Sequence, residues 1–295
     1  MSEIDIGIHS SSVLVELNIR CWSAKKRDKQ ASADMDINQG CTEEVYEGYK
    51  RLFAGNELLK DISKKASKIR AWHTESTLPW SDKGPRLLPT KTFFEYKKEL
   101  SRQKADWEKL TQQFLSEYTS LVTKLAYSLG RAYDPNEYPT IDELKDKFSF
   151  SYSVTPMPTS GDFRIDIGNQ AMKELGDHYE QVIQDRVASA MKTAWVRLHK
   201  QLEQMSERLA DGDSEGNHKT FRDTLVSNAK DLVTSLKHFN INNDPNLEKA
   251  RLALADTLSD VHDPQDLRDF RPERLKVKNK VDDILDKFKG VGSWQ

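Results

Sequence analysis

The most metal-like pattern in the sequence is the acidic loop at residues 211–222, DGDSEGNHKTFR. Asp211, Asp213 and Glu215 occupy the first, third and fifth ligand positions of a helix–loop–helix calcium site. The twelfth position of such a loop needs a bidentate glutamate, and Arg222 stands there instead. A cation cannot replace the strongest anionic ligand. We therefore interpret the loop as a turn between helices and predict no metal.

Other residue types that carry out catalysis are scattered. Cys21 and Cys41 do not have the spacing of a CxxC pair, and none of the seven histidines forms the i, i+4 pair of a helical zinc site. The sequence also lacks a glycine-rich phosphate loop and a GxSxG nucleophile elbow. We therefore expect neither a catalytic residue nor a cofactor, and predict that the protein is not an enzyme.

The best candidates for contact with a protein partner lie in the segment STLPWSDKGPRLLPTK, residues 76–91. Its three prolines and one glycine argue against regular structure, yet it is rich in large apolar side chains. A rigid loop loses little entropy on binding, and an indole offers a large contact area. Alternatively, the loop covers the sheet. The candidate interaction residues are Leu78, Trp80, Arg86, Leu87 and Leu88.

Composition limits the possible classes of partner. The chain has 295 residues and a formal net charge of −2, so its overall charge does not favour nucleic acid as a partner. No apolar run approaches the roughly 20 residues that span a bilayer, and the N-terminus lacks the pattern of a signal peptide. We therefore expect a cytoplasmic protein with reduced thiols and no membrane association.

Alternating apolar residues predict three strands. They lie at residues 13–22, 148–154 and 163–167, and the last two are joined by a proline- and glycine-containing loop. Since an isolated hairpin is marginally stable in water, the N-terminal strand is the expected third member of a small antiparallel sheet. The stretch 23–40 shows no periodicity and predicts an irregular connection, and Thr42 is a candidate cap for a helix that starts at EEVYEGYKRLF.

Two long helices are predicted from apolar stripes at residues 92–130 and 170–210. The second contains a heptad-like seam of Trp195, Leu198, Leu202, Met205 and Leu209. We expect the two helices to pack antiparallel as a coiled-coil-like hairpin on the sheet, with further helices toward the C-terminus. The predicted fold is α+β and predominantly α-helical. Residues 1–170 form an N-terminal region, and residues 171–295 form a helical region that packs on it, both within one structural unit.

Several short segments in the first part of the chain resemble the sequences of an uncharacterised family found in tailed phages and bacteria. They are the segment Cys21, Trp22, Ser23, Ala24 after the first strand; Leu78-Pro79-Trp80 with Arg86-Leu87-Leu88-Pro89; and Tyr133, Asp134, Pro135, Tyr138 and Pro139 before the predicted hairpin. The family is called domain of unknown function thirty-one fifty, and the resemblance covers about residues 13–170.

The resemblance implies a partner but no chemistry. Members are often encoded near a MoxR-type AAA ATPase, which implies that this chain is a phage or bacterial adaptor for such an ATPase, in the host cell cytoplasm if phage-encoded. The long helices also allow a homo-oligomer. An alternative function is a phage factor that binds single-stranded nucleic acid, through basic helix faces and exposed aromatics, or that inhibits a host nuclease or defence system. An enzyme without a recognisable motif is the third hypothesis.

Overall fold

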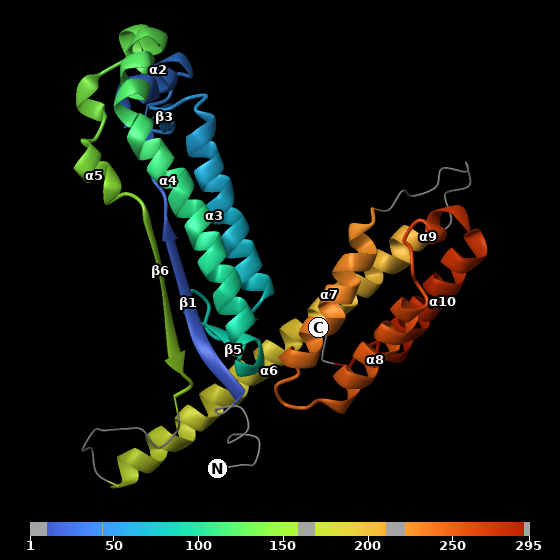
Figure 1. The fold of residues 1–295 in the computed structure, drawn as a ribbon. Coiled ribbons are helices and arrows are strands. Elements are labelled where there is room, and N and C mark those ends of the chain that lie inside the picture. The colour runs from blue at the N-terminus through green and yellow to red at the C-terminus, as the bar shows by residue number, and fades with distance from the viewer. Residues whose placement is uncertain (1–10, 43, 159–168, 211–221, 292–295) are drawn as a thin grey trace. The chain divides into compact units, whose positions relative to one another are not determined.

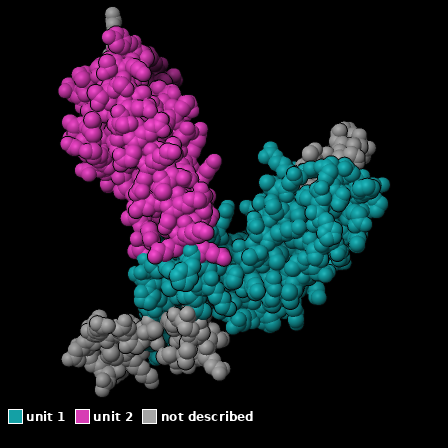
Figure 2. Space-filling view, viewed as in Figure 1, with its two compact units in different colours: residues 1–16, 74–94, 154–295 teal, residues 17–73, 95–153 magenta. Residues whose placement is uncertain are grey.

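The computed structural model describes residues 11–42, 44–158, 169–210 and 222–291. The chain divides into two compact units (Figure 2). Unit 1 comprises residues 1–16, 74–94 and 154–295, and unit 2 comprises residues 17–73 and 95–153. Each unit is therefore built from stretches that are distant in sequence, and the units do not correspond one to one with the two sequence regions divided at residue 170.

The described elements are mostly helices, with a few short strands (Figure 1). The strands are β1 (Ser12–Arg20), β2 (Lys25–Asp28), β3 (Gly48–Arg51), β4 (Leu78–Pro79), β5 (Arg86–Pro89) and β6 (Ser149–Pro156). The helices are α2 (Lys29–Asn38), α3 (Glu57–Glu75), α4 (Phe93–Leu129), α5 (Ile141–Lys145), α6 (Asn169–Leu209), α7 (Thr224–Phe239), α8 (Pro245–Ser259), α9 (Asp266–Asp269) and α10 (Arg271–Lys287). The prediction of a predominantly helical α+β protein with a small antiparallel sheet is confirmed.

The larger sheet has four described strands in the order β4-β5-β1-β6. Strand β5 pairs antiparallel with β1 in the register Leu14↔Leu87, and β4 pairs antiparallel with β5 in the register Leu78↔Leu87. Two of the three predicted strands, at residues 13–22 and 148–154, correspond to β1 and β6. The third, at residues 163–167, lies outside the described residues. Both β4 and β5 come from the segment 76–91, which was predicted to be irregular.

The prolines of β4 and β5 are compatible with the sheet because each is the last residue of its strand. Pro79 ends β4, which is the edge strand, and Pro89 is the last residue of β5. A missing N–H donor costs little at an edge or at a strand end, whereas it would break a ladder in the middle of a sheet. Between the strands, Gly84 donates its N–H to Ser81 Oγ at 3.1 Å. A Cβ on residue 84 would lie 2.7 Å from that oxygen, so a larger residue there would displace the Ser81 hydroxyl and disturb this bond.

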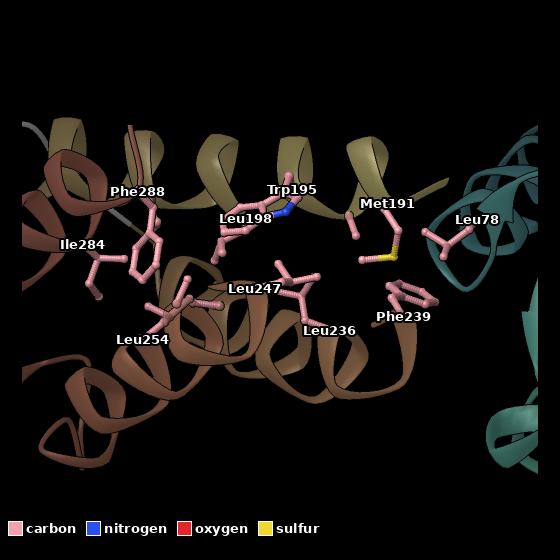
Figure 3. Packing of buried hydrophobic residues seen from close by; sticks show 14 of the residues in the cluster. Leu78, Met191, Trp195, Leu198, Leu236, Phe239, Leu247, Leu254, Ile284 and Phe288 are labelled. Carbon is pink, nitrogen blue, oxygen red and sulfur yellow. The ribbon is translucent and has the colours of Figure 1, made fainter. Parts of the chain in front are cut away.

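Helix α6 is the centre of the helical part of unit 1. Its seam of Trp195, Leu198, Leu202, Met205 and Leu209 is buried as predicted. Figure 3 shows side chains from α7, α8 and α10 facing this seam, among them Leu236, Leu254 and Ile284. The indole N–H of Trp195 donates to Asp244 Oδ2 at 3.0 Å, and the other oxygen of Asp244 accepts the N–H of Asn246 at the start of α8. One carboxylate therefore caps α8 and fixes it to α6.

In unit 2, α4 packs antiparallel against α3 (Figure 1). Lys65 Nζ contacts Asp106 Oδ2 at 2.7 Å, and eight residues further along α3 His73 Nδ1 lies 2.7 Å from the hydroxyl of Tyr96. The Trp72 ring stacks on the same tyrosine with 4.8 Å between centroids. The apolar stripe of α4 is completed by aromatic residues from outside the helix pair: Trp107 packs against Phe148 at 6.4 Å.

The predicted hairpin of residues 92–130 with residues 170–210 therefore needs correction. Both helices exist at nearly the predicted bounds, as α4 and α6. However, they belong mainly to different units, and helices of the same unit cover each stripe: α3 covers α4, and α7, α8 and α10 cover α6. The apolar stripe of each helix predicts that the helix packs against other apolar side chains. A stripe of leucines and aromatic residues does not predict which helix provides those side chains.

A second correction concerns residues 23–51. The stretch predicted as an irregular connection forms β2 and α2, and the segment after Thr42 forms β3 instead of a helix. The two strands pair antiparallel, with Lys25 opposite Arg51 and Arg27 opposite Tyr49. Both strands are short and largely charged, KKRD and GYKR, so they show no alternation of apolar and polar residues, which is why the sequence pattern missed them.

Candidate functional site

The predicted interaction residues lie mostly inside unit 1. Leu78, Leu87 and Leu88 are completely buried, and Trp80 is 4% exposed. Leu78, Trp80 and Leu87 belong to the same apolar core as Ile183 and Val187 of α6, and the Arg186 guanidinium lies over the Trp80 ring at 5.4 Å. These side chains hold the sheet against a helix in this structure, which is the covering role that the sequence left open.

Arg86, in contrast to these buried residues, is half-buried. It binds the segment that follows the end of α3. Its Nε donates to Thr77 Oγ1 at 2.7 Å. Arg197 of α6 donates to the carbonyls of Thr74 and Thr77, both at 2.8 Å, and to that of Glu75. Burial, and then the charge of Arg86, lower the pKa of Arg197 to about 10, so it remains a cation at neutral pH. Cations suit this place because the last carbonyls of a helix lack internal donors.

Unit 2 carries an open cleft of about 430 Å³ beside the end of β1. Its lining combines a thiol, an indole, a hydroxyl and charges of both signs: Arg20, Cys21, Trp22, Ser23, Glu143, Asp146 and Lys147. Two connections give the cleft its shape. The Arg20 guanidinium donates to the backbone carbonyl of Asp146, and Glu143 closes a capping box by accepting the N–H of Thr140 at 2.8 Å.

An aromatic cluster next to the cleft joins the segment at Trp22 to the segment at Tyr138. The ring of Trp22 lies 5.4 Å from that of Phe53, which lies 5.8 Å from Tyr138. Tyr118 connects the same segments on a second route: its ring is 6.3 Å from Trp22, and its hydroxyl donates to the Pro139 carbonyl at 2.8 Å. The sequence gave no periodic pattern that links these segments, so apolar spacing could not predict their contact.

The segment at Trp22 also contains an unusual backbone conformation. Ala24 has a φ of 49°, in the left-handed region that few residues with a side chain adopt, and it is buried. The carbonyl of Ala24 accepts the N–H of Leu52 at 2.8 Å. Such a residue costs about 1 kcal/mol or more, and surrounding contacts have to hold it. The left-handed conformation of Ala24 turns the backbone, so that β2 begins at the next residue, Lys25.

Two side chains of the cleft, Cys21 and Glu143, have shifted pKa values, and neither shift activates the group as a nucleophile or a base. Burial raises the pKa of the Cys21 thiol, and the opposing effects of Trp107 and Arg70 do not overcome it, so the thiol is neutral at pH 7. A neutral thiol is a poor nucleophile. Hydrogen bonds from the Thr140 backbone and hydroxyl lower the pKa of Glu143, which makes this carboxylate a weak base. The groups can bind a polar ligand by charge and hydrogen bonding.

Elsewhere, the described part of the chain offers no group of three or more histidine, cysteine, aspartate or glutamate side chains that could hold a metal ion. Most of the acidic loop discussed above, residues 211–221, lies outside the described residues. Both cysteines are free thiols and half-buried. Within the described ranges, no helix combines the length and the apolar character that crossing a membrane requires.

Comparisons with known proteins give no relative: no family model matches the chain, and neither curated proteins nor solved structures contain a significant match.

Proposed function

We propose that this chain is a non-enzymatic interaction protein that holds a peptide segment of a partner in the cleft of unit 2. The observation that carries the proposal is the lining of this cleft, which combines an indole with hydrogen-bonding groups and charges of both signs. Trp22 and Ser23 line it, and the Trp22 ring packs against Phe53, which in turn packs against Tyr138. An adaptor needs a shaped surface with polar groups that fix orientation, and it needs no activated nucleophile.

The lining suits a peptide better than a small apolar ligand. Lys147 and Arg20 can bind acceptors such as carbonyls and carboxylates, and Glu143 can bind N–H donors; a peptide backbone carries both kinds of group at regular intervals. The Trp22 indole adds an apolar contact area within the same cleft.

The resemblance to the phage and bacterial family suggests which partner to test. We propose a MoxR-type AAA ATPase encoded in the same genome, for which this chain would act as an adaptor. Homo-oligomer formation is a further part of the proposal, and it would present several copies of the cleft to a ring-shaped ATPase.

Affinity purification from cells that express the full chain with its ATPase tests the proposal. Ser23→Trp fills the mouth of the cleft, because Ser23 is exposed there, and Ser63→Trp places the same indole on the exposed face of α3 as a matched control. We expect the ATPase to be recovered with the wild-type chain and with Ser63→Trp, and to be lost with Ser23→Trp. Recovery with Ser23→Trp, or failure of the wild-type chain to recover the ATPase, would refute the proposal.

The alternative of single-stranded nucleic-acid binding makes a separate prediction. Binding to phosphates must weaken steeply as the salt concentration rises, because it releases counterions. A gel shift with a single-stranded oligonucleotide across salt concentrations therefore distinguishes this alternative from the adaptor function.

A further inference from the structure

The two-stranded sheet of unit 2, β2 with β3, presents cations to water on one of its faces. In an antiparallel pair, directly opposite residues carry their side chains on the same side of the sheet, and so do residues two positions apart along a strand. Lys25 lies opposite Arg51, and Arg27 lies opposite Tyr49. These four residues therefore share one face, which we call the β2–β3 face, and all four are exposed.

Lys25 and Arg51 repel each other at one end of the β2–β3 face. Like charges directly opposite each other on two strands destabilise a sheet. Among the described residues, neither side chain has an ion-pair or hydrogen-bond partner. The pair is therefore unfavourable in the free chain, and a carboxylate from another molecule would offset this cost.

The acidic residues of the same stretch do not neutralise this pair. Residues 25–51 contain six cations and six carboxylates, and five of these carboxylates belong to the described residues. Each of the five contacts a backbone N–H, a side-chain amide or the Arg27 guanidinium; they are Asp28, Asp34, Asp36, Glu44 and Glu47. The balanced charge of the whole stretch therefore leaves a local excess of two positive charges where Lys25 faces Arg51.

The backbone around this pair is held in place by the rest of unit 2. Leu52 donates its N–H to the Ala24 carbonyl at 2.8 Å, directly beyond the end at which Lys25 and Arg51 lie. On the opposite face of the sheet, Lys26 and Lys50 both contact the carboxylate of Glu137. A preformed site loses less conformational entropy when a ligand binds.

Carboxylates of a protein segment fit the β2–β3 face better than the phosphates of a nucleic acid. Two unpaired cations match one or two carboxylates, and a guanidinium such as that of Arg51 can hold a carboxylate by two parallel hydrogen bonds. A row of phosphates along the same face would also meet Glu44 and Glu47, which lie 3.5 and 3.2 Å from the Arg27 guanidinium and would repel it. The ring of Tyr49, 57% exposed, offers apolar contact to a neighbouring side chain of a peptide.

We infer that the β2–β3 face binds an extended segment of a partner protein that carries acidic residues at alternate positions. Side chains two residues apart in an extended segment lie on one side of it, about 7 Å from each other, so two of them can reach Lys25 and Arg51 together. The β2–β3 face shares no residue with the lining of the cleft, so this binding is independent of the cleft and of the ATPase.

A designed peptide with a fluorescent label serves as the probe. It has about ten residues, roughly 33 Å when extended, with glutamate at alternate positions and serine between them. A second peptide has lysine in place of every glutamate, and a labelled single-stranded oligonucleotide represents nucleic acid. Fluorescence polarisation with the full chain should show binding of the glutamate peptide that weakens as salt rises, and at least about tenfold weaker binding of the lysine peptide. Equal binding of the two peptides would overturn the inference, as would tighter binding of the oligonucleotide than of the glutamate peptide at the same salt concentration.

Variants then locate the binding site. Lys25→Gln with Arg51→Gln removes both charges from exposed positions and should weaken binding of the glutamate peptide by about fivefold or more at low salt. The urea midpoint of this variant should stay the same or rise, because the repulsion between the strands is gone. Lys68→Gln with Lys98→Gln is the matched control: it removes two exposed lysines of α3 and α4, changes the net charge by the same amount, and should bind like the wild type. Wild-type affinity of the Lys25 and Arg51 variant, or an equal loss in the control, would overturn the inference.

Discussion

Replacing Trp80 with alanine tests the structural role of the segment 76–91 most directly. The indole is 4% exposed and lies in the core of unit 1, with the Arg186 guanidinium over its ring at 5.4 Å. A buried aromatic side chain removes roughly 150–250 Å² from water, worth about 4–6 kcal/mol at roughly 25 cal/mol per Å². Compactness of the unfolded chain reduces this by roughly 10–40%, so the variant should lose about 3–5 kcal/mol of unfolding free energy.

Urea denaturation followed by circular dichroism measures this loss. With a slope of about 3 kcal/mol per molar urea, the midpoint for Trp80→Ala should fall by about 1–2 M. Phe94→Ala is the control from the same unit: Phe94 is 80% exposed, and its loss should cost less than about 0.5 kcal/mol. If Trp80→Ala costs as little as the control, the core role of Trp80 is wrong. If the variant remains folded and loses a partner, the interaction role is supported instead.

Three further predictions follow from the two cores and their charges. Leu198→Asp in unit 1 and Trp107→Asp in unit 2 each place an unpaired charge in a buried site, and each should lower the unfolding free energy in urea by about 4 kcal/mol or more; a change below about 1 kcal/mol would contradict the burial. Arg197→Met removes the donor for three carbonyls and should cost about 2–3 kcal/mol, whereas Arg197→Lys should recover part of this loss in the same assay. The Arg102 guanidinium is the main cause that lowers the pKa of Glu99 from 4.5 to about 2, so the pair stabilises the fold above about pH 4.5 and this contribution is lost as the pH falls toward 2. Because the pair is partly exposed, Glu99→Gln should reduce stability at pH 7 by less than about 1 kcal/mol and reduce the difference between pH 7 and pH 3; an unchanged difference would refute the assignment.

Sequence reasoning predicted the elements whose signals are local. The long helices were expected at residues 92–130 and 170–210, and they run from Phe93 to Leu129 and from Asn169 to Leu209. The segment TIDE, residues 140–143, has the sequence pattern of a capping box, and both hydrogen bonds of the box form in the structure. An apolar stripe or a cap acts within a few turns of one helix, so neighbouring residues in the sequence contain the whole signal.

Part of the candidate site could be anticipated and part could not. The sequence analysis singled out the segments that contain Trp22 and Tyr138, and the structure joins these two residues through Phe53. The charged wall of the cleft could not be anticipated, because the sequence pattern marks Glu143 only as part of a helix cap and Lys147 carries no signal of its own. The facing cations Lys25 and Arg51 were also missed, because the two short strands that carry them show no alternation of apolar and polar residues.

The sequence by itself determined that long amphipathic helices and at least two strands form, and where they begin and end. Only the tertiary structure decided what covers them. The seam of α6 is covered by α7, α8 and α10, and the leucines of the segment 76–91 became strands β4 and β5 beside β1. The physical reason is that apolar burial is not directional: a stripe gains almost the same free energy against any complementary surface. Shape, chain connectivity and a few specific bonds, such as that of Trp195 to Asp244, select the partner that forms.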